Sequence, residues 1–264
     1  MRIRTAALLA LLCIALSPAH AQSSANSFPG LDPALIDDLV AANRILAHEK
    51  VLDGYGHVSV RDPRNPDHYL MARSLAPALV TADDIMEYDL DSNPIDARGR
   101  TSYKERYIHG EIYKARPDVM AVIHSHSPTI VPFSVSKTPL RAILHNAGFL
   151  AAGPPVFDIR DVGGDTTLLV ETPAFGRALA KTLGDGDIVL MRGHGDTVVA
   201  ENVRLATYMA IYAEIDAREL AVALALGGPV TYLDDGEVKA TVANMRNHAY
   251  ERPWQLWKRD AMGR

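Results

Sequence analysis

The feature of the sequence that most constrains the fold is an apolar run that ends in two histidines. Residues 119–126 read VMAVIHSH, and small and β-branched apolar residues of this kind favour a buried strand. Side chains at positions i and i+2 of a strand point to the same face, so His124 and His126 would project together from its end. Such a pair can reach one metal ion, but a solvated or hydrogen-bonded pair of surface histidines fits the pattern as well.

A second apolar segment also ends in a histidine. Residues 187–191, DIVLM, predict a buried strand, and the residues that follow place His194 between Gly193 and Gly195. Glycines leave the space around this imidazole free. Three neutral imidazoles with one open coordination position are typical of a catalytic divalent-metal site, because structural zinc usually takes four protein ligands.

A carboxylate is expected beside these histidines. Residues 102–116 predict a helix directly before the histidine strand, with Glu105 on it and His109 one turn later on the same face. Glu105 could therefore belong to a metal site. It could also be a solvated helix carboxylate that pairs with Lys104 or Arg106.

The rest of the chain predicts one domain in which helices and strands are mixed. Asp32 can cap a helix that starts at Pro33 and runs to about residue 50. Further helices are expected over residues 172–186 and 202–228, and short strands over residues 56–60 and 68–72. Strict strand–helix–strand alternation is absent, which favours a single α/β domain.

The N-terminus has the pattern of a cleavable export signal. Arg2 and Arg4 precede an apolar stretch at residues 6–16, and Ala19-His20-Ala21 has the small-x-small form of a cleavage site. We expect a signal peptide over residues 1–21, cut after Ala21, and export of the chain to the periplasm. A polar, disordered lead-in is expected over residues 22–30 and the folded domain over residues 31–264.

Composition excludes several kinds of partner. The chain has 27 basic and 32 acidic side chains and no basic patch, which argues against nucleic-acid binding. Its single cysteine, Cys13, lies in the expected signal, so no disulfide would stabilise the mature chain. No further segment is long and apolar enough to cross a membrane once the signal is removed.

The motifs together resemble the class II aldolase/adducin family. The resemblance rests on YGHVSVR at residues 55–61, on Glu105 followed by His124-x-His126, and on RGHG at residues 192–195. It covers roughly residues 32–225 and implies a single αβα-layered domain around a central mixed, largely antiparallel sheet. It also implies a homotetramer with sites near the subunit interfaces.

The resemblance implies roles for the site residues. His124, His126 and His194 would bind a divalent metal ion, for which zinc is the first expectation and manganese, cobalt and iron are alternatives. Glu105 would transfer protons and could ligate the ion when substrate is absent. His145, in ILHNAGF, is a second acid/base candidate, although a core or hydrogen-bonded histidine is an equally good interpretation.

Departures from the family pattern bear on the substrate. The hydroxyl and amide donors that bind phosphate in the sugar-phosphate aldolases of the family are replaced by His57, by Arg73 and by the pair Tyr103-Lys104. We therefore expect these four residues to bind a small substrate without phosphate. Arg73 and Lys104 suit a carboxylate, although each could also be a surface cation without a ligand.

Other stretches are similar to the decarboxylase branch of the family. They are residues 73–91, 133–161 and 252–258, and that branch acts on hydroxylated aromatic carboxylates and ring-cleaved dienoates. We expect a metal-dependent carbon–carbon lyase that decarboxylates such a substrate. Retro-aldol cleavage, epimerase or dehydratase chemistry, and a non-catalytic adducin-like interaction module are the alternatives. Trp254 and Trp257 share a helix face and either pack in the core or cap the site.

Overall fold

The structure is a computed structural model, and it describes residues 28–263. The expected signal peptide, residues 1–21, and residues 22–27 of the expected lead-in lie outside this range. Residues 28–30 form a turn, in which the backbone N–H of Leu31 donates to the carbonyl of Phe28 over 3.1 Å. Between residues 28 and 263, no helix has both the length and the apolar character needed to cross a membrane.

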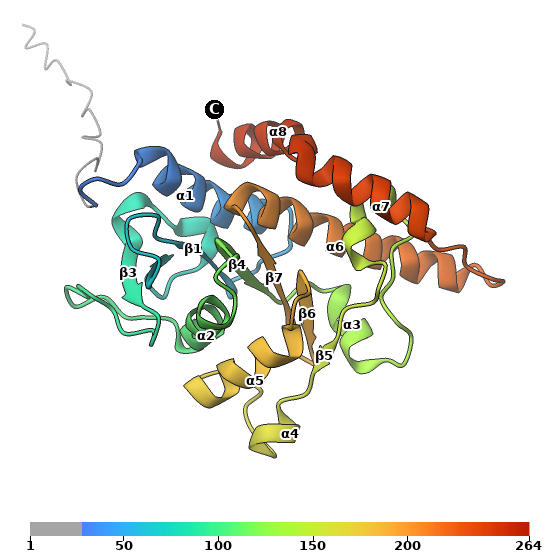
Figure 1. Ribbon diagram of the computed structural model, residues 1–264, viewed down its shortest axis with the longest axis horizontal. Helices are drawn as coiled ribbons and strands as arrows, with labels where there is room; N and C mark the ends of the chain where they lie inside the picture. Colours follow the sequence, from blue (N-terminus) through green and yellow to red (C-terminus); the bar gives the residue numbers. More distant parts are fainter. Residues whose placement is uncertain (1–27, 264) are drawn as a thin grey trace, which may run out of the picture.

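Within residues 28–263, eight α-helices and seven strands form the domain (Figure 1). The helices are α1 (Pro33–His48), α2 (Tyr107–Ala115), α3 (Ile130–Val135), α4 (Arg160–Gly163), α5 (Pro173–Leu183), α6 (Val203–Ala225), α7 (Asp235–Asn244) and α8 (Glu251–Met262). The strands are β1 (His57–Arg61), β2 (His68–Ala72), β3 (Ile85–Asp89), β4 (Ala121–Ser125), β5 (Val156–Phe157), β6 (Ile188–Met191) and β7 (Gly195–Ala200).

All seven strands belong to one mixed sheet. Its order is β3-β2-β1-β4-β7-β6-β5, and every neighbouring pair is antiparallel except the parallel pair β5–β6. Helices α1, α6 and α8 lie on one side of the sheet, and α2 and α5 lie on the other (Figure 1). The expected αβα layering around a largely antiparallel sheet is confirmed.

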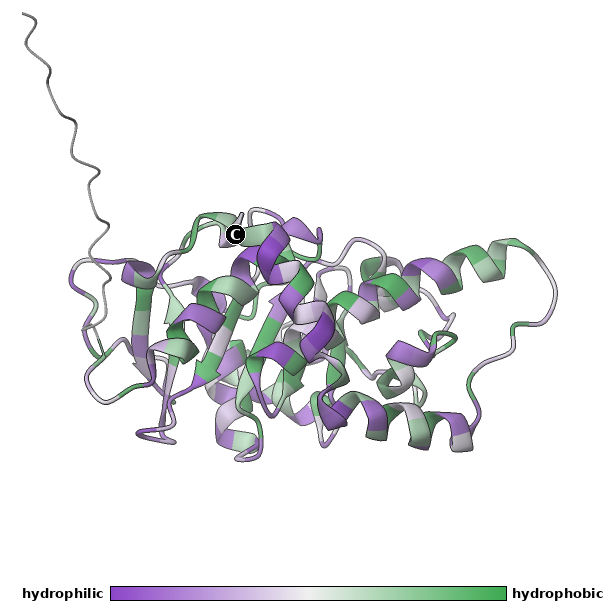
Figure 2. Ribbon diagram, turned by 90° about the horizontal axis from the view of Figure 1, so that it is seen from above, coloured by the Kyte–Doolittle hydropathy of each residue, from purple (hydrophilic) through white to green (hydrophobic). Residues whose placement is uncertain are grey.

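Local signals in the sequence start and end several of these helices. The Asp32 side chain accepts from the backbone N–H of Ala34 at the start of α1, and the Thr172 side chain accepts from that of Phe175 at the start of α5. These caps satisfy backbone donors that the first helical turn leaves free. Figure 2 shows bands of hydrophobic and hydrophilic residues along the helices, as expected for helices that bury one face.

Each side of the sheet has its own hydrophobic core. One core packs α1, α6 and α8 against the sheet and includes Leu46 and Leu205, and the other packs α2 and α5 and includes Ile112 and Leu179. Trp254 and Trp257 are buried in the first core, where the ring of Trp257 lies 6.4 Å from that of Tyr208. Of the two roles considered for these tryptophans, the structure supports core packing.

Three of the strands differ from the sequence-based expectation, which did not include them. They are β3, β5 and β7, and the third follows the glycine-flanked His194 directly. The glycines predict the end of a strand, whereas Gly193 lies in the turn of a β6–β7 hairpin and Gly195 begins β7. β5 has only two residues, which is too short to show a periodicity of its own.

Candidate metal centre

His124 and His126 project together at the end of a central strand. β4 pairs with β1 on one side and with β7 on the other, and it ends at Ser125. His124 is therefore the penultimate residue of the strand, and His126 directly follows it. Their imidazole rings are 5.2 Å apart between centroids, which confirms the expectation that the two side chains lie on the same side.

His194 reaches this pair from the β6–β7 turn. Its ring centroid lies 4.9 Å from each of the His124 and His126 centroids. The close approach depends on Gly195, because a Cβ atom added there would lie 1.8 Å from the carbonyl oxygen of Ser125. The turn that carries His194 can approach the end of β4 because glycine has no side chain at the point where the two backbones cross.

Glu105 reaches the histidines from a position that differs from the expected one. It lies in a 3-10 turn (Lys104–Arg106) before α2, with φ −88° and ψ 18°, and not on the α-helix. The Arg106 side chain holds this turn, because its guanidinium donates to the carbonyls of Ser92 and Tyr103 over 2.9 and 3.0 Å. His109 lies on α2 itself, where its Nε2 is 2.7 Å from Nδ1 of His57.

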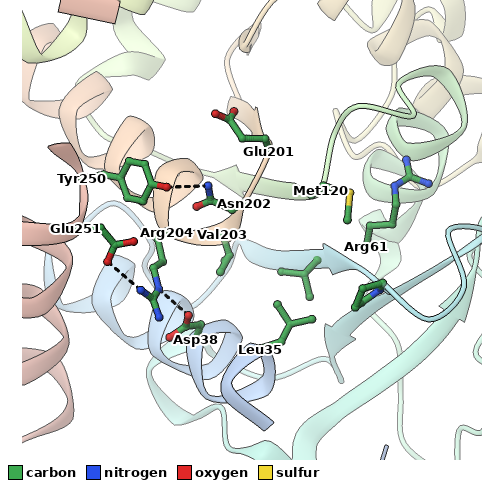
Figure 3. A pocket seen from close by; sticks show the side chains of 12 residues that line it. Leu35, Asp38, Arg61, Met120, Glu201, Asn202, Val203, Arg204, Tyr250 and Glu251 are labelled. Carbon is green, nitrogen blue, oxygen red and sulfur yellow. Dashed lines mark hydrogen bonds and ion pairs between the residues drawn. The ribbon is translucent and has the colours of Figure 1, made fainter. Parts of the chain in front are cut away.

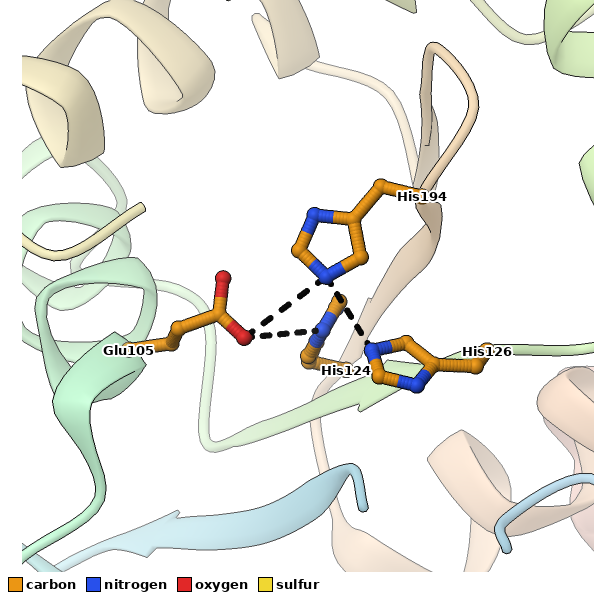
Figure 4. A group of neighbouring side chains, drawn as sticks. All are labelled: Glu105, His124, His126 and His194. Atoms are coloured by element: carbon orange, nitrogen blue, oxygen red, sulfur yellow. Dashed lines mark hydrogen bonds and ion pairs between the residues drawn. The ribbon is translucent and has the colours of Figure 1, made fainter. Parts of the chain in front are cut away.

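The four side chains converge on one point (Figure 4). Oε2 of Glu105 lies 3.6 Å from Nε2 of His124 and 3.6 Å from Nε2 of His194. Nε2 of His126 lies 3.0 Å from Nε2 of His194. One ligand atom from each of the four residues lies within 4.8 Å of all the others, as the donors around one metal ion must.

Backbone carbonyls orient two of the imidazoles. Nδ1 of His124 lies 2.9 Å from the Asp196 carbonyl oxygen, and Nδ1 of His194 lies 3.0 Å from that of Leu168. A carbonyl only accepts, so each Nδ1 carries the proton and each Nε2 presents a lone pair. Nε2 of His124 is buried and has no hydrogen-bond partner within residues 28–263. A divalent metal ion fits this donor set, because it would satisfy the orphaned nitrogen.

Burial also affects the protonation states of these four side chains. Burial lowers the pKa of His124 well below its ordinary value, and the neighbouring His194 lowers it further. Burial and His194 likewise lower the pKa of His126. Neutral imidazoles are the form that binds metal ions. Burial raises the pKa of Glu105, while His194 and the N–H of Val170 oppose that rise.

The comparison with known proteins agrees with this geometry. Residues 37–220 match the class II aldolase and adducin N-terminal domain. The chain belongs to the class II aldolase and adducin family. The three histidines and Glu105 all lie inside the matched segment, and the family expected from the sequence motifs is therefore confirmed.

Two relatives of this family member are named decarboxylases. Decarboxylase tropJ of Talaromyces stipitatus is 33% identical over 84% of this chain and 91% of its own length. The 3,4-dihydroxyphthalate decarboxylase of Arthrobacter keyseri is 30% identical over 76% of this chain and 83% of its own length. These relatives support a lyase role. An L-fuculose 1-phosphate aldolase structure from Glaciozyma antarctica has a TM-score of 0.73 at 24% identity, covering 87% of this chain and 90% of that one, and confirms the fold.

An open pocket of about 480 Å³ lies beside the metal centre of this class II aldolase-fold chain. This volume is in the range of small-molecule sites. Glu105 and His126 line it, and so do three of the four residues expected to bind substrate, which are His57, Tyr103 and Lys104. Lys104 is largely exposed, and its Nζ is 4.0 Å from the carboxylate of Glu171. The hydroxyl of Tyr103 donates to the Leu75 carbonyl, and burial raises its pKa to about 12.

The structure does not bring Arg73 or His145 to this pocket. Nε of Arg73 donates to Asp84 over 2.7 Å, and the neighbouring Ser74 lines the pocket in its place. His145 is exposed at the start of a 3-10 segment (His145–Leu150) that packs against α7 and α6. Within residues 28–263, neither side chain forms a hydrogen bond or ion pair with a side chain of the candidate metal centre, so their roles in substrate binding and acid/base chemistry stay predictions.

Sequence reasoning missed several residues of the pocket wall. Tyr55, Ser74 and Leu169 line it from loops. The ring of Tyr55 lies 6.0 Å from that of His126 and is 71% exposed. Loop residues follow no periodicity, so the only available signal was the position of Tyr55 inside the motif at residues 55–61.

A second pocket lies at the opposite ends of β1 and β4 (Figure 3). Arg204 in its wall donates to Asp38 over 2.7 Å and to Glu251 over 2.9 Å, and Asn202 donates to Tyr250. These charged and polar side chains therefore satisfy one another's hydrogen-bonding groups. The interactions join α6 to α1 and to the start of α8, which is a structural role.

Proposed function

We propose that the protein is a metal-dependent carbon–carbon lyase that decarboxylates a hydroxylated aromatic carboxylate. The observation that carries the proposal is the convergence of three imidazole Nε2 atoms and the Glu105 carboxylate at the edge of an open pocket. The relatives named decarboxylases support the reaction type. The substrate of the Arthrobacter keyseri relative, 3,4-dihydroxyphthalate, is an aromatic carboxylate with adjacent hydroxyl groups.

His124, His126 and His194 would hold a divalent ion through their Nε2 atoms. Zinc is the first candidate, because three histidines with an open position are a common catalytic zinc site, and manganese, cobalt and iron are alternatives. When bound, such an ion acts as a Lewis acid that attracts the negative charge developing on adjacent substrate oxygens. The carbonyls of Asp196 and Leu168 keep two of the imidazoles in the tautomer that binds.

Glu105 would deliver a proton to the substrate. The backbone N–H of Val170 donates to Oε1 of Glu105 over 2.9 Å, which fixes the carboxyl and leaves Oε2 on the side of the histidines. When carbon dioxide leaves, the electron pair of the broken C–C bond stays on the substrate carbon, and that carbon must take up a proton. A carboxyl group beside the pocket can transfer it.

The pocket wall suits a planar anion. The Lys104 ammonium group lies at the pocket and offers a charge partner for a substrate carboxylate. The rings of Tyr55, His57 and Tyr103 also line the pocket and provide flat surfaces for an aromatic ring. The hydroxyl of Tyr103 is already committed to the Leu75 carbonyl, so this residue would contribute its ring.

Retro-aldol cleavage is the alternative reaction on the same donor set. It is supported by the shared fold of the aldolase structure, but His57, Tyr103 and Lys104 are not the small hydroxyl and amide donors that would hold a sugar phosphate. A non-catalytic adducin-like module is the alternative of another class. It would give no reason for the chain to bring three imidazoles and a buried carboxylate together.

Carbon dioxide release tests the proposal. The purified protein, loaded with zinc or with manganese, is incubated with 3,4-dihydroxyphthalate and with a panel of hydroxybenzoates, and carbon dioxide and the decarboxylated product are measured. We expect release that stops after chelation and falls by about 10²- to 10⁴-fold in Glu105→Gln. Products that keep every carbon atom would indicate an epimerase or dehydratase. No turnover of any substrate with a loaded metal site would favour the interaction module.

We further propose that the chain is exported to the periplasm and forms a homotetramer. The basic start, the apolar stretch and the Ala19-His20-Ala21 motif support the first statement. Mass spectrometry of the protein from a bacterial periplasmic fraction should find Gln22 as the first residue. Light scattering of the purified protein tests the second statement, and a monomer or dimer would contradict it.

A further inference from the structure

Four buried polar side chains form a chain of hydrogen bonds outside the metal centre. Nδ1 of His57 lies 2.7 Å from Nε2 of His109, and Nδ1 of His109 lies 2.6 Å from Oγ of Ser59. Oγ of Ser59 lies 2.8 Å from the hydroxyl of Tyr113. We call these four side chains the buried relay. It leads from the wall of the pocket, at His57, into the core between the sheet and α2.

The buried relay follows from the periodicities of two elements. His57 and Ser59 are two residues apart on β1 and point to the same face of the sheet. His109 and Tyr113 are four residues apart on α2 and lie on the same face of the helix. None of the four is more than 3% exposed. A polar side chain so deeply buried needs its hydrogen bonds, because an unpaired donor there destabilises the fold.

The proton of Tyr113 determines the direction of the whole relay. Within residues 28–263 the only side chain that can accept from the Tyr113 hydroxyl is Ser59. Ser59 Oγ therefore accepts from Tyr113, and its own proton is donated to Nδ1 of His109. The opposite direction would leave either the buried Tyr113 proton or the buried Ser59 proton without a side-chain acceptor within the described residues.

The direction then passes from His109 to His57. Burial lowers the pKa of His109 to about 3, so this imidazole is neutral and carries one proton. Since Nδ1 accepts from Ser59, that proton is on Nε2 and is donated to Nδ1 of His57. The proton of a neutral His57 must then be on Nε2. Because Nδ1 faces His109, the opposite edge of the ring, with Nε2, is the edge available to the pocket.

We propose that Tyr113, Ser59 and His109 hold His57 as the tautomer protonated at Nε2, and that His57 donates a hydrogen bond from this nitrogen to a negatively charged oxygen of the substrate. The oxygen belongs to a carboxylate or a phenolate, because these are the strongest acceptors on a hydroxylated aromatic acid. This choice of substrate rests on the proposed function. The tautomer of His57 does not, since it follows from the hydrogen bonds and from the burial of the two imidazoles.

The position of His57 gives this donor a catalytic use. His57 pairs with His124 across the β1–β4 ladder, and the two rings are 5.1 Å apart. A substrate oxygen held near the metal centre is therefore within reach of a donor that is already oriented. A preorganised donor stabilises charge that develops on such an oxygen during the reaction. His109, Ser59 and Tyr113 do not line the pocket and act as positioning residues.

Solid-state ¹⁵N NMR tests the tautomer directly. The purified, zinc-loaded protein is labelled only in its histidine rings, and the His57 signals are assigned by their loss in His57→Gln. We expect an unprotonated nitrogen at Nδ1 and a protonated one at Nε2. A wild-type spectrum with the proton on Nδ1 of His57 would overturn the proposal without any variant. The measurement needs no substrate, so it stands even if no decarboxylation is found.

Variants test whether Tyr113 sets the direction. Tyr113→Phe keeps the ring but removes the terminal donor, so His57 should become a mixture of the two tautomers. Tyr88→Phe is the matched control, because Tyr88 is equally buried in the same core but donates to Ser102 and not to the buried relay. The control should keep the wild-type spectrum. Unchanged His57 signals in Tyr113→Phe would contradict the relay. Ser59→Ala removes a middle member of the buried relay, and it replaces Tyr113→Phe as the test variant if Tyr113→Phe does not fold.

Kinetics connect the tautomer to the substrate. If 3,4-dihydroxyphthalate is decarboxylated, His57→Phe should lower kcat about 100-fold with its bound metal retained, as expected for a lost charge-stabilising donor. Tyr113→Phe should lower kcat about tenfold with little change in KM, and Tyr88→Phe should match the wild type. An unchanged kcat in His57→Phe would refute its role as a donor. Absence of turnover in the wild type would instead count against the proposed function.

Discussion

His57 and His124 face each other in the β1–β4 ladder, with their imidazole rings 5.1 Å apart. This register joins the candidate metal centre to the pocket, because His124 belongs to the four residues that could hold a metal ion and His57 lines the pocket wall. A shift by one residue would turn the His57 side chain to the other face of the sheet. The pairing of two strands therefore determines whether the pocket and the metal centre share one site.

Metal content is the first prediction. The purified protein should bind about one divalent ion per chain, and His124→Ala should lose it because this variant removes a buried Nε2 donor. Metal analysis of both proteins after dialysis measures the difference. His48→Ala is the control, since His48 lies half-exposed on α1 and pairs with Glu49. Equal metal content in wild type and His124→Ala would show that the ion is bound elsewhere or not at all.

Removal of the ion should also change stability. A ligand that binds only the folded state at 100 times its dissociation constant stabilises by about 2.7 kcal/mol. Chelation should therefore lower the Tm of the wild type and leave the Tm of His124→Ala unchanged. Differential scanning fluorimetry with and without a chelator measures this effect. A wild-type Tm that does not respond would argue against a bound metal ion.

Gly195 should tolerate no side chain. Gly195→Ala places a Cβ 1.8 Å from the Ser125 carbonyl oxygen, so β4 and the turn that carries His194 must move apart. We expect the free energy of unfolding to fall by about 1–3 kcal/mol, the usual range for overpacking, together with weaker metal binding. Gly54→Ala is the matched control, because a Cβ there meets nothing within 4 Å. Urea titrations compare the two, and equal stabilities would contradict the close approach.

Asp216 should make stability depend on pH. Burial raises the pKa of Asp216 from 3.8 to about 6, while the N–H groups of Ile143 and Leu144 that donate to Oδ1 oppose the rise. The folded state thus binds this proton more tightly than the unfolded chain. The stabilisation is complete below pH 3.8 and is lost as the pH rises through about 6.

Asp216→Asn tests this dependence. The amide keeps an oxygen acceptor for the two backbone N–H groups and carries no charge at any pH. The free energy of unfolding of the variant, relative to the wild type, should therefore rise between about pH 4 and about pH 7.5. Urea titrations of both proteins at the two pH values give the difference. A relative stability that is constant or falls with pH would show that Asp216 has no raised pKa in the folded protein.

Lys104 and Arg73 should differ in their effect on the substrate. Lys104 lines the pocket, whereas Arg73 donates to Asp84. Loss of a charge-assisted hydrogen bond of about 1.5 kcal/mol raises KM about tenfold, so Lys104→Gln should show this increase with 3,4-dihydroxyphthalate. Arg73→Gln should leave KM unchanged and should lower stability. The opposite result in steady-state kinetics would assign the carboxylate to Arg73.

Local patterns were enough to predict that the strand-end histidines lie together. The i, i+2 spacing of His124 and His126, the glycines around His194 and the capping residue Asp32 each act within a few positions of the chain. Strand and helix geometry therefore predicted the strand-end histidines and the α1 helix correctly. The family motifs added the αβα fold, which no single periodicity shows.

Contacts between distant segments of the chain could not be predicted from local patterns, because they depend on long-range packing. Glu105 lies in a 3-10 turn before α2, and the Arg106 side chain holds this turn by donating to the Ser92 carbonyl of another loop. His109 contacts His57 because α2 packs over β1. Such contacts depend on how whole elements cover the sheet, which adjacent residues do not encode. The tautomers at the metal centre and along the buried relay follow from these contacts, and so does the chemistry they allow.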